Sequence, residues 1–175
     1  MADEDGEISW YDPDPRAILP LDRFHVSRTL SRTVRQGHFE VRVNNSFSAV
    51  IQQCARPGLD GDEIWINTEI MDSYIRLHQL GYAHSVETWI EGKLVGGLYG
   101  VAVNGLFAGE SMFSVKRDAS KIALVYLVQH LQRKGFLILD VQFMTDHLQR
   151  FGAVVISRAE YQEQLARAIT LPVSF

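Results

Sequence analysis

The dipeptide Asn104-Gly105 constrains the fold of this chain more than any other feature. Asn-Gly between two apolar runs is the strongest short-range signal for a tight β-hairpin, because both residue types tolerate positive φ. Here it joins residues 94–103 to residues 106–113, and both segments are β-type. The sequence therefore predicts an antiparallel pair of strands near the middle of the chain, around which the other elements must be placed.

The remaining segments predict a mixed sheet with helices packed on it. Further strands are expected at residues 39–44, 84–90, 136–143 and 153–156, and helices at residues 27–35, 46–55, 68–80, 119–133, 145–152 and 157–169. We expect Asp118 to cap the start of the long helix, Gly135 to end it, and Ser157 with Glu160 to form a capping box. The Pro- and Asp-rich residues 1–22 are expected to be turn or extended chain. This order of elements matches the α+β, N-acetyltransferase-like (GNAT-type) fold class, a mixed sheet flanked by helices.

Composition excludes several classes of protein. The 175 residues are 46% apolar and carry a net charge of −4, which argues against a general nucleic-acid binder and against DNA as a partner. The one cysteine, Cys54, allows no disulfide framework or cysteine-based metal cluster, and the six histidines lack the H-E-x-x-H spacing of zinc enzymes. No apolar run reaches the roughly 20 residues that span a bilayer, and the acidic N-terminus lacks a signal-peptide pattern. We therefore expect a cytoplasmic protein with no metal site and no membrane partner.

Glycines interrupt the predicted hairpin strands at Gly96, Gly97, Gly100 and Gly109. Glycine weakens a strand, and it often marks either a β-bulge or a close approach of the backbone to a ligand. Both interpretations remain open, and the second predicts backbone access for a bound ligand.

The same stretch contains Glu110 among apolar neighbours. A carboxylate in such surroundings needs a cationic or donor partner, which an incoming ammonium or guanidinium would supply; the alternative is a surface charge on the strand.

Two polar residues lie two positions apart in the very apolar strand predicted at residues 136–143. This spacing places Asp140 and Gln142 on one face of the strand. A buried polar group without a hydrogen bond costs about 1–3 kcal/mol, so the pair must be satisfied. Either neighbouring backbone groups satisfy it as a structural pair, or Asp140 orients Gln142 beside a reacting amine.

Cations and aromatic residues form two further candidate sets. Arg23, Arg28, Arg32, Arg35 and Arg42 gather within residues 23–42 of an otherwise acidic chain. They form either a solvated face or a phosphate-binding patch. Five aromatic residues from separate segments either converge on one pocket or pack separately in the core: Trp10, Tyr11, Trp65, Tyr99 and Phe107.

The segment before the long predicted helix indicates which kind of acyl donor the chain can use. An acetyl-CoA enzyme of this fold class has a glycine-rich turn there, which binds the pyrophosphate. Residues 113–121 contain no glycine. The sequence therefore predicts that any acyl donor is not a CoA thioester.

Long blocks of the sequence resemble the leucyl/phenylalanyl-tRNA–protein transferases. The blocks are WYDPDPRAILPL (10–21), HVSR (25–28), IWIN (64–67), LHQLGYAHSVETW (77–89), GGLYGVAVNGLFAGESMFS (96–114), DASK (118–121) and LDVQFMTDHLQRFGA (139–153). The resemblance implies an aminoacyltransferase that moves leucine or phenylalanine, less often methionine, from aminoacyl-tRNA to the N-terminal Arg or Lys of acceptor proteins, marking them for N-degron degradation. It implies no metal, nucleotide or CoA cofactor. The partners that it implies are the 3′ end of aminoacyl-tRNA and proteins with such N-termini.

The resemblance also implies roles for individual residues. Asp140 and Gln142 match the catalytic Asp-x-Gln of the family, and Glu110 matches its active-site Glu. Leu127, in the long predicted helix, is expected to affect the preference for the transferred side chain. Six residues match family positions around the aminoacyl pocket and the acceptor: Trp10, Tyr11, Trp65, Phe107, Ser111 and Met112. The residues expected to contact tRNA phosphates are Arg23, Arg28, Arg32, Arg35, Lys116, Arg117 and Lys121.

The family usually has an N-terminal module of some tens of residues before the WYDPDPR block. We therefore expect residues 1–22 to be an extended segment with that module largely missing, and residues 23–175 to be the aminoacyltransferase domain. Two other functions remain open. One is an aminoacyl-tRNA-dependent transferase with another acceptor. The other is a non-catalytic binder of basic N-termini, which would need Glu110 but not the pair Asp140 and Gln142.

Overall fold

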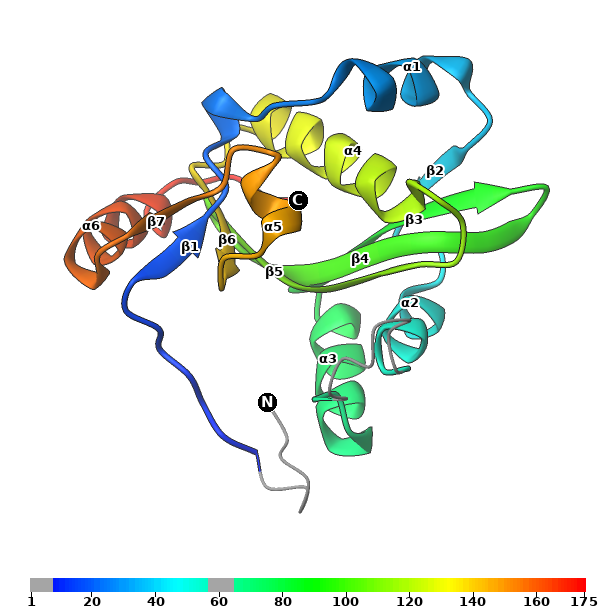
Figure 1. Cartoon of the computed structure of the whole chain (residues 1–175). Coiled ribbons are helices and arrows are strands. Elements are labelled where there is room, and N and C mark those ends of the chain that lie inside the picture. Colours follow the sequence, from blue (N-terminus) through cyan, green and yellow to red (C-terminus); the bar gives the residue numbers. More distant parts are fainter. Residues whose placement is uncertain (1–7, 57–64) are drawn as a thin grey trace.

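A computed structural model describes residues 8–56 and 65–175, which form one seven-stranded sheet with helices on both faces (Figure 1). The strand order is β2-β3-β4-β5-β6-β1-β7. Every neighbouring pair is antiparallel except β5 with β6, which is parallel. This arrangement confirms the predicted α+β, N-acetyltransferase-like fold class. Residues 1–7 and 57–64 lie outside the described residues.

The elements follow the predicted order. The strands are β1 (Arg16–Ile18), β2 (Glu40–Val43), β3 (Ala83–Ile90), β4 (Lys93–Val103), β5 (Leu106–Ser114), β6 (Ile138–Gln142) and β7 (Val154–Ile156). The helices are α1 (Arg28–Gln36), α2 (Phe47–Cys54), α3 (Thr68–Gln79), α4 (Ala119–Lys134), α5 (Asp146–Gln149) and α6 (Arg158–Ala168), with a 3₁₀ turn η1 (Leu21–Arg23). Strand β1 and turn η1 are additional to the predicted set, and β1 places part of the N-terminal segment inside the sheet.

The ends of the helices follow the sequence signals, with one exception. The capping box at Ser157 and Glu160 forms, and Gly135 ends α4 in the left-handed conformation, as predicted. Asp118 occupies the N-cap position of α4, but its side chain makes no capping hydrogen bond. The predicted N-cap position of Asp118 is therefore confirmed, but the capping hydrogen bond does not form. Its carboxylate instead accepts a hydrogen bond from Lys121 Nζ at 2.7 Å.

The two sides of the sheet carry different cores. The main core packs α4 and α1 against one face of the strands, and a second core packs α2 and α3 against the other (Figure 1). Among the described residues, none of the helices is long and apolar enough to cross a membrane.

Three of the four glycines in the predicted hairpin strands make room for this chain's own atoms. A Cβ at Gly96 would lie 2.5 Å from Ala119 Cβ, so Gly96 lets the start of α4 approach the sheet. A Cβ at Gly100 would overlap the ring of Phe107. At Gly97 it would lie 2.9 Å from a carbonyl oxygen of β3. The predicted ligand access at these three positions is therefore wrong, because neighbouring elements already fill the space.

Glu110 is the extra residue of a β-bulge in β5. Ser111 pairs with Tyr99 and Gly109 pairs with Gly100, which leaves Glu110 without a partner on β4. A bulge bends its strand and redirects the side chains beside it. The bulge interpretation of the glycines is therefore confirmed at Gly100. Gly109 differs from the other three, because the nearest atom to a Cβ there would be a carbonyl oxygen of β6 at 3.6 Å.

Strands β5 and β6 pair only over their first residues. The register runs from Leu106 opposite Ile138 to Ala108 opposite Asp140 and then stops. Beyond these pairs the two parallel strands separate. The candidate site lies at this separation.

Candidate functional site

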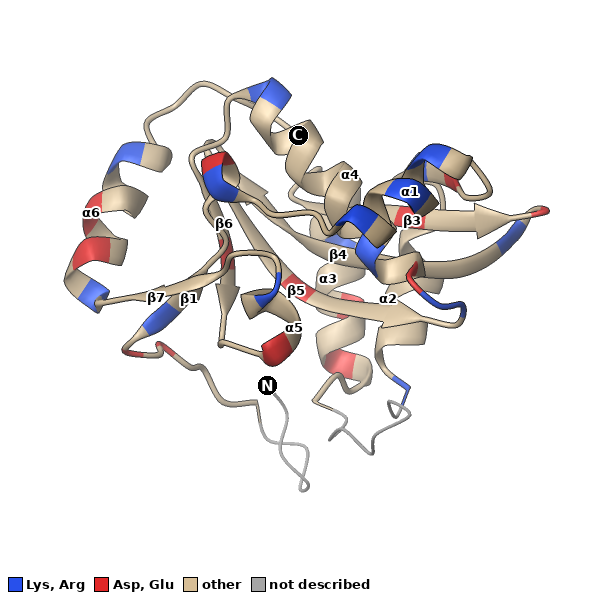
Figure 2. Cartoon of the chain, turned by 45° about the horizontal axis from the view of Figure 1, so that its top comes forward, with Lys and Arg blue, Asp and Glu red and all other residues tan. Residues whose placement is uncertain are grey.

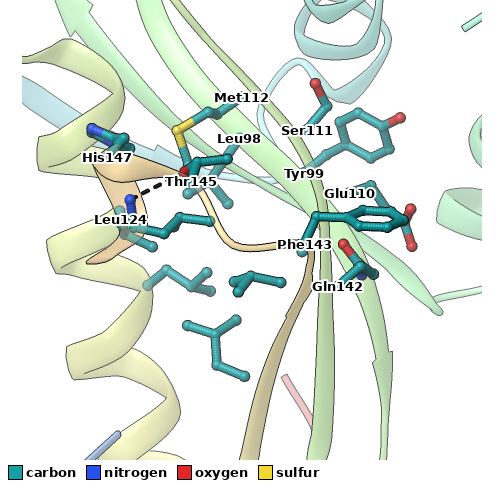
Figure 3. Close-up of a pocket in the computed structure, with 15 residues that line it drawn as sticks. Leu98, Tyr99, Glu110, Ser111, Met112, Leu124, Gln142, Phe143, Thr145 and His147 are labelled. Carbon is teal, nitrogen blue, oxygen red and sulfur yellow. Dashed lines mark hydrogen bonds between the residues drawn. The ribbon is translucent and has the colours of Figure 1, made fainter. Parts of the chain in front are cut away.

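An apolar cavity of about 310 Å³ lies where β5 and β6 separate (Figure 3). It lies on the α4 side of the sheet, since Leu124 and Leu127 of α4 contribute to its wall. Its volume is at the lower end of the usual range for ligand pockets. The other lining residues are Leu98, Tyr99, Gly109, Glu110, Ser111, Met112, Leu139, Val141, Gln142, Phe143, Thr145, His147 and Leu148.

A second, more polar cavity of about 330 Å³ has Tyr74 of α3 in its wall. Helix α3 packs on the face of the sheet opposite α4 (Figure 1). Glu110, Gln142 and Phe143 line both cavities and so form the boundary between them. A ligand seated in one cavity would therefore meet a ligand seated in the other at these three residues. The remaining walls of the polar cavity come from Ser9, Trp10, Tyr11, Pro13, Arg16, Trp65, Tyr74 and Ala108.

Asp140 is buried beside this boundary and is fully hydrogen-bonded. Its carboxylate accepts from Arg16 Nη2 at 2.8 Å and from the Tyr161 hydroxyl at 2.7 Å. It also accepts from the backbone N–H of Gln142 at 2.9 Å. Asp140 is only 1% exposed, and it lines neither of the two cavities. The contact with Gln142 is therefore made through the backbone and not through the side-chain amide.

The backbone turns sharply at Gln142. Its φ is 56°, and Phe143 N–H donates to the carbonyl oxygen of Val141 at 2.6 Å, which closes a three-residue turn. An L residue rarely adopts this left-handed conformation, so the bond from Gln142 N–H to Asp140 helps to hold it. The prediction of a regular strand through Phe143 is wrong at its end, because β6 stops at Gln142 and the alternation of faces stops with it.

Arg16 connects the N-terminal segment to Asp140. Its guanidinium stacks over the Tyr161 ring at 4.4 Å and donates to Asp12 Oδ1 at 3.2 Å. Burial disfavours the charge of Arg16, but the hydrogen bond and charge of Asp140 outweigh burial and raise the pKa of Arg16. Burial, followed by the charge of Asp140, raises the pKa of Tyr161, which therefore remains a hydroxyl donor. These contacts hold Asp140 in place from two other elements of the fold.

Glu110 has a different environment from Asp140. Burial raises the pKa of Glu110, and the charge of Asp140 raises it further, while a hydrogen bond from Tyr74 opposes the rise. Burial also raises the pKa of Tyr74, so that its hydroxyl stays protonated. A cation in the polar cavity would therefore stabilise the ionised form of the Glu110 carboxyl group.

The variant Glu110→Gln is expected to change how stability depends on pH. Because the pKa of Glu110 is raised on folding, the folded chain binds the proton more tightly than the unfolded chain. This contribution to stability is complete below the ordinary carboxyl pKa of 4.5 and is lost as the pH rises through the raised value. Glutamine keeps an acceptor for Tyr74 but does not titrate. Urea unfolding across this range should therefore show that the variant gains stability relative to the unmodified chain as the pH rises. Parallel curves for the two chains would contradict the burial of a charge at Glu110.

The structure places most of the predicted pocket residues at the two cavities. Ser111 and Met112 line the apolar cavity. Trp10, Tyr11 and Trp65 line the polar cavity, and Trp10 is 93% exposed.

Phe107 lines neither cavity, and its predicted place at the pocket is corrected. It is fully buried in the main core, with its ring centroid 5.3 Å from that of Phe175. The bulge at Glu110 explains the difference, because it ends the regular alternation between Phe107 and the residues beyond it.

Most of the predicted tRNA-contacting cations lie on α1 or around the start of α4 (Figure 2), and Arg23 lies at the end of η1. Arg117 and Lys121 line a groove of about 600 Å³ that α1 also borders. Arg42 is held elsewhere, because it pairs with Glu40 at 2.8 Å and stacks over Trp89. The other predicted cations are exposed: Arg23, Arg28, Arg32, Arg35 and Lys116.

Sequence reasoning missed several residues at the site. They are the partners Arg16, Tyr74 and Tyr161, the boundary residue Phe143 and the groove residue Arg150. One signal was available: a buried carboxylate such as Asp140 needs a cation. Nothing in the local pattern indicates that the cation lies 124 residues away.

The described ranges 8–56 and 65–175 offer neither a cluster of metal ligands nor an activated thiol. There, no group of three or more His, Cys, Asp or Glu residues is placed to hold a metal ion. Burial raises the pKa of Cys54 to about 12, against the effect of a hydrogen bond with Ser111, so the thiol is not an activated nucleophile.

Comparison with known proteins identifies the family of this chain. The model of the family described as leucyl/phenylalanyl-tRNA protein transferase matches residues 18–166. A leucyl/phenylalanyl-tRNA–protein transferase of Herpetosiphon aurantiacus is 55% identical over 174 residues, which cover 99% of this chain and 89% of that one. One from Maricaulis maris is 51% identical over 172 residues, which cover 98% and 80%.

A solved structure is also similar in its overall fold. The structure of L-PGS from Bacillus licheniformis matches with a TM-score of 0.53 at 14% identity. The match covers 89% of this chain and 65% of that one, so this chain spans less than two thirds of its length. This likeness shows the fold alone, whereas the two relatives and the family model show the family. The chain belongs to the leucyl/phenylalanyl-tRNA protein transferases, a family of aminoacyltransferase enzymes.

Proposed function

We propose that this chain transfers leucine or phenylalanine, and methionine less often, from aminoacyl-tRNA to the N-terminal Arg or Lys of acceptor proteins. The observation that supports this is the boundary formed by Glu110, Gln142 and Phe143 between an apolar and a polar cavity. The side chain of the aminoacyl group occupies the apolar cavity. Its ester carbonyl lies at the boundary, where the acceptor amine arrives from the polar cavity.

The lining of the apolar cavity supports this choice of donor. Leu98, Met112, Leu124 and Leu127 present aliphatic surface. A polar aminoacyl side chain would lose its hydrogen bonds to water there without replacing them. Such a cavity separates aliphatic side chains that differ by one methylene by only about 1–3 kcal/mol. Selection among Leu, Phe and Met therefore depends on shape.

The reaction needs alignment more than activation, because the donor is already an ester. The neutral α-amine attacks the ester carbonyl, an amide bond forms, and the bond to the ribose oxygen breaks. The proton lost by the amine ends on the ribose hydroxyl that leaves. Gln142 contacts the amine or the developing oxyanion as a hydrogen-bonding group, since an amide is a poor base. Asp140 fixes the turn that presents Gln142.

The acceptor and the terminal nucleoside are proposed to share the polar cavity. Glu110 pairs there with the cationic end of the acceptor, a charge-assisted contact that suits Arg or Lys. Trp10, Tyr11 and Trp65 offer aromatic faces on which a base can stack.

The proposal also covers tRNA binding, the extent of the domain and the fate of the modified proteins. The exposed cations of α1 and of the start of α4 hold phosphates of the tRNA without reading its sequence. Residues 23–175 would form the aminoacyltransferase domain, to which the preceding segment contributes β1. The modified proteins would enter N-degron degradation in the cytoplasm.

The test is an incubation with leucyl-tRNA and a peptide that begins with Arg. We expect the mass of the peptide to increase by one leucine residue, because donor and acceptor meet at the boundary. Matched peptides that begin with Asp, or that carry an acetylated N-terminus, should remain unchanged. Binding of the Arg peptide without transfer would favour a non-catalytic adaptor, and transfer to other acceptors alone would favour a different aminoacyl-tRNA-dependent transferase.

A further inference from the structure

We infer that the ring of Phe143 stacks on the cationic side chain of the acceptor's N-terminal residue, opposite Glu110, and so favours Arg over Lys as the acceptor. This inference rests on the proposed function and adds to it a residue that determines acceptor specificity. It depends on the position of the Phe143 ring, on its exposure and on the charges around it.

Phe143 directly follows the turn at Gln142. The φ of 56° at Gln142 and the hydrogen bond from Phe143 N–H to the carbonyl oxygen of Val141 fix the backbone there. Among the described residues, Phe143 is the one aromatic residue other than Tyr99 and His147 that lines the apolar cavity, and it also lines the polar one. Its ring points toward the side chains of Glu110 and Gln142 (Figure 3). An acceptor amine held at Gln142 therefore brings the side chain of the same acceptor residue close to this ring.

The Phe143 ring is accessible to a ligand. Phe143 is 50% exposed, although its side chain is large and apolar. Within residues 8–56 and 65–175, the ring makes neither a ring–ring contact nor a cation–π contact. A cation in the polar cavity can therefore approach the face of this ring without displacing another side chain from it.

The carboxylate of Glu110 lies in the same wall as the ring. In the part of the chain that the structure describes, Glu110 forms no ion pair. Arg16 also lines the polar cavity, but its guanidinium already pairs with Asp140 at 2.8 Å and with Asp12 at 3.2 Å. A cation that enters the polar cavity would thus meet an unpaired carboxylate and an aromatic face together.

A guanidinium matches these two groups better than an ammonium does. It is planar and weakly hydrated, so it can stack on a ring while its edge donates two hydrogen bonds to a carboxylate. An ammonium is also attracted to an aromatic face, but it is a compact and strongly hydrated charge. We therefore expect Arg to bind more tightly than Lys, and the neutral planar analogue citrulline to bind more weakly than either.

The other aromatic residues of the polar cavity suit the terminal nucleoside instead. Trp10, Tyr11 and Trp65 line the polar cavity and are absent from the wall of the apolar one. The ring of Tyr74 packs edge-on against Tyr99 at 5.2 Å. A base stacked on the first three rings would therefore leave Phe143 to the acceptor.

The experiment measures the binding of fluorescent peptides that differ only in their first residue, which is Arg, Lys or citrulline. Anisotropy titrations without a donor give the Kd of each peptide. Phe143→Leu keeps an apolar side chain but removes the ring, so it should raise the Kd of the Arg peptide about fivefold, with little change for the citrulline peptide. Phe143→Tyr keeps the ring and should retain the preference for Arg. With leucyl-tRNA as the common donor, Phe143→Leu should also lower the ratio of kcat/KM for the Arg peptide to that for the Lys peptide.

Met144→Leu is the matched control. Met144 is the next residue along the chain and is also exposed, but it lines neither cavity. This variant should leave the Kd values of all three peptides unchanged. Because each transfer ratio is measured with the same donor, effects of a substitution on the apolar cavity cancel in it.

Three results would overturn the inference. The first is the absence of a preference for Arg over citrulline in the unmodified chain. The second is an unchanged Kd of the Arg peptide in Phe143→Leu, or an equal rise for the Arg and citrulline peptides, which would indicate a change of shape. The third is a loss of the preference in Trp65→Leu and not in Phe143→Leu, which would assign the stack to another ring. If the unmodified chain transfers leucine to no peptide, the proposed function fails, whereas the Kd values still decide the role of Phe143.

Discussion

Asp140→Ala is expected to abolish transfer and to lower the free energy of unfolding by about 3–5 kcal/mol, the usual cost of removing one partner of a buried ion pair. The variant removes the buried acceptor of the Tyr161 hydroxyl and of Arg16, whose guanidinium keeps only its hydrogen bond to Asp12. It also frees the N–H of Gln142, whose left-handed turn would then relax. The loss of activity would therefore come through Gln142, while the loss of stability would come from the partners of Asp140.

Gln142→Ala is the matched comparison for this prediction. Gln142 lines both cavities, and its side chain is only half-buried. Its removal should stop transfer with little change in urea unfolding. Tyr161→Phe removes one hydrogen bond to Asp140 and should give an intermediate loss of stability of about 1 kcal/mol. Transfer at the normal rate by folded Asp140→Ala would refute the role given to Asp140.

Leu127→Phe is expected to shift the donor preference away from phenylalanine and toward leucine. Leu127 is buried in α4 and lines the apolar cavity. The larger ring can enter the cavity of about 310 Å³, where it takes space that the side chain of phenylalanine would need. Transfer of phenylalanine should fall at least about tenfold relative to leucine, within the range that pocket shape provides. The measurement is the ratio of kcat/KM values for the two charged tRNAs.

Leu131→Phe, one turn further along α4, serves as its control. Leu131 is also fully buried, but it does not line the cavity. The added ring has no space to enter, so overpacking should cost about 1–3 kcal/mol of stability while the donor preference stays the same. An unchanged preference in Leu127→Phe would place the donor side chain outside this cavity.

Much of the fold could be predicted from the sequence, because the signals for its elements are local. The hairpin at Asn104-Gly105, the capping box at Ser157 and the stop at Gly135 each depend on residues a few positions apart. Asp118 occupies its predicted N-cap position without a capping hydrogen bond, because the nearby Lys121 donates to its carboxylate instead.

The site was less predictable, because its geometry depends on departures from regular structure. The expected alternation of side chains between the two faces of a strand assumes that the strand is unbroken. Strand β5, however, has a bulge at Glu110, and β6 ends in a turn at Gln142. These two irregularities bring both side chains to the boundary of the cavities and leave Phe107 in the core. No local sequence rule could identify Arg16 as the partner of Asp140, because the two residues are far apart in the sequence.

The position of β1 between β6 and β7 has a consequence for biosynthesis. Strand β1 leaves the ribosome long before β6 and β7, the two strands with which it pairs. Contacts of such long sequence separation form slowly, because the intervening chain must first be made and closed into a loop. Arg16 cannot meet Asp140 and Tyr161 until α6 has been translated. Nascent or prematurely terminated chains that lack α6 would therefore lack this support for Gln142, and we expect no transferase activity from them.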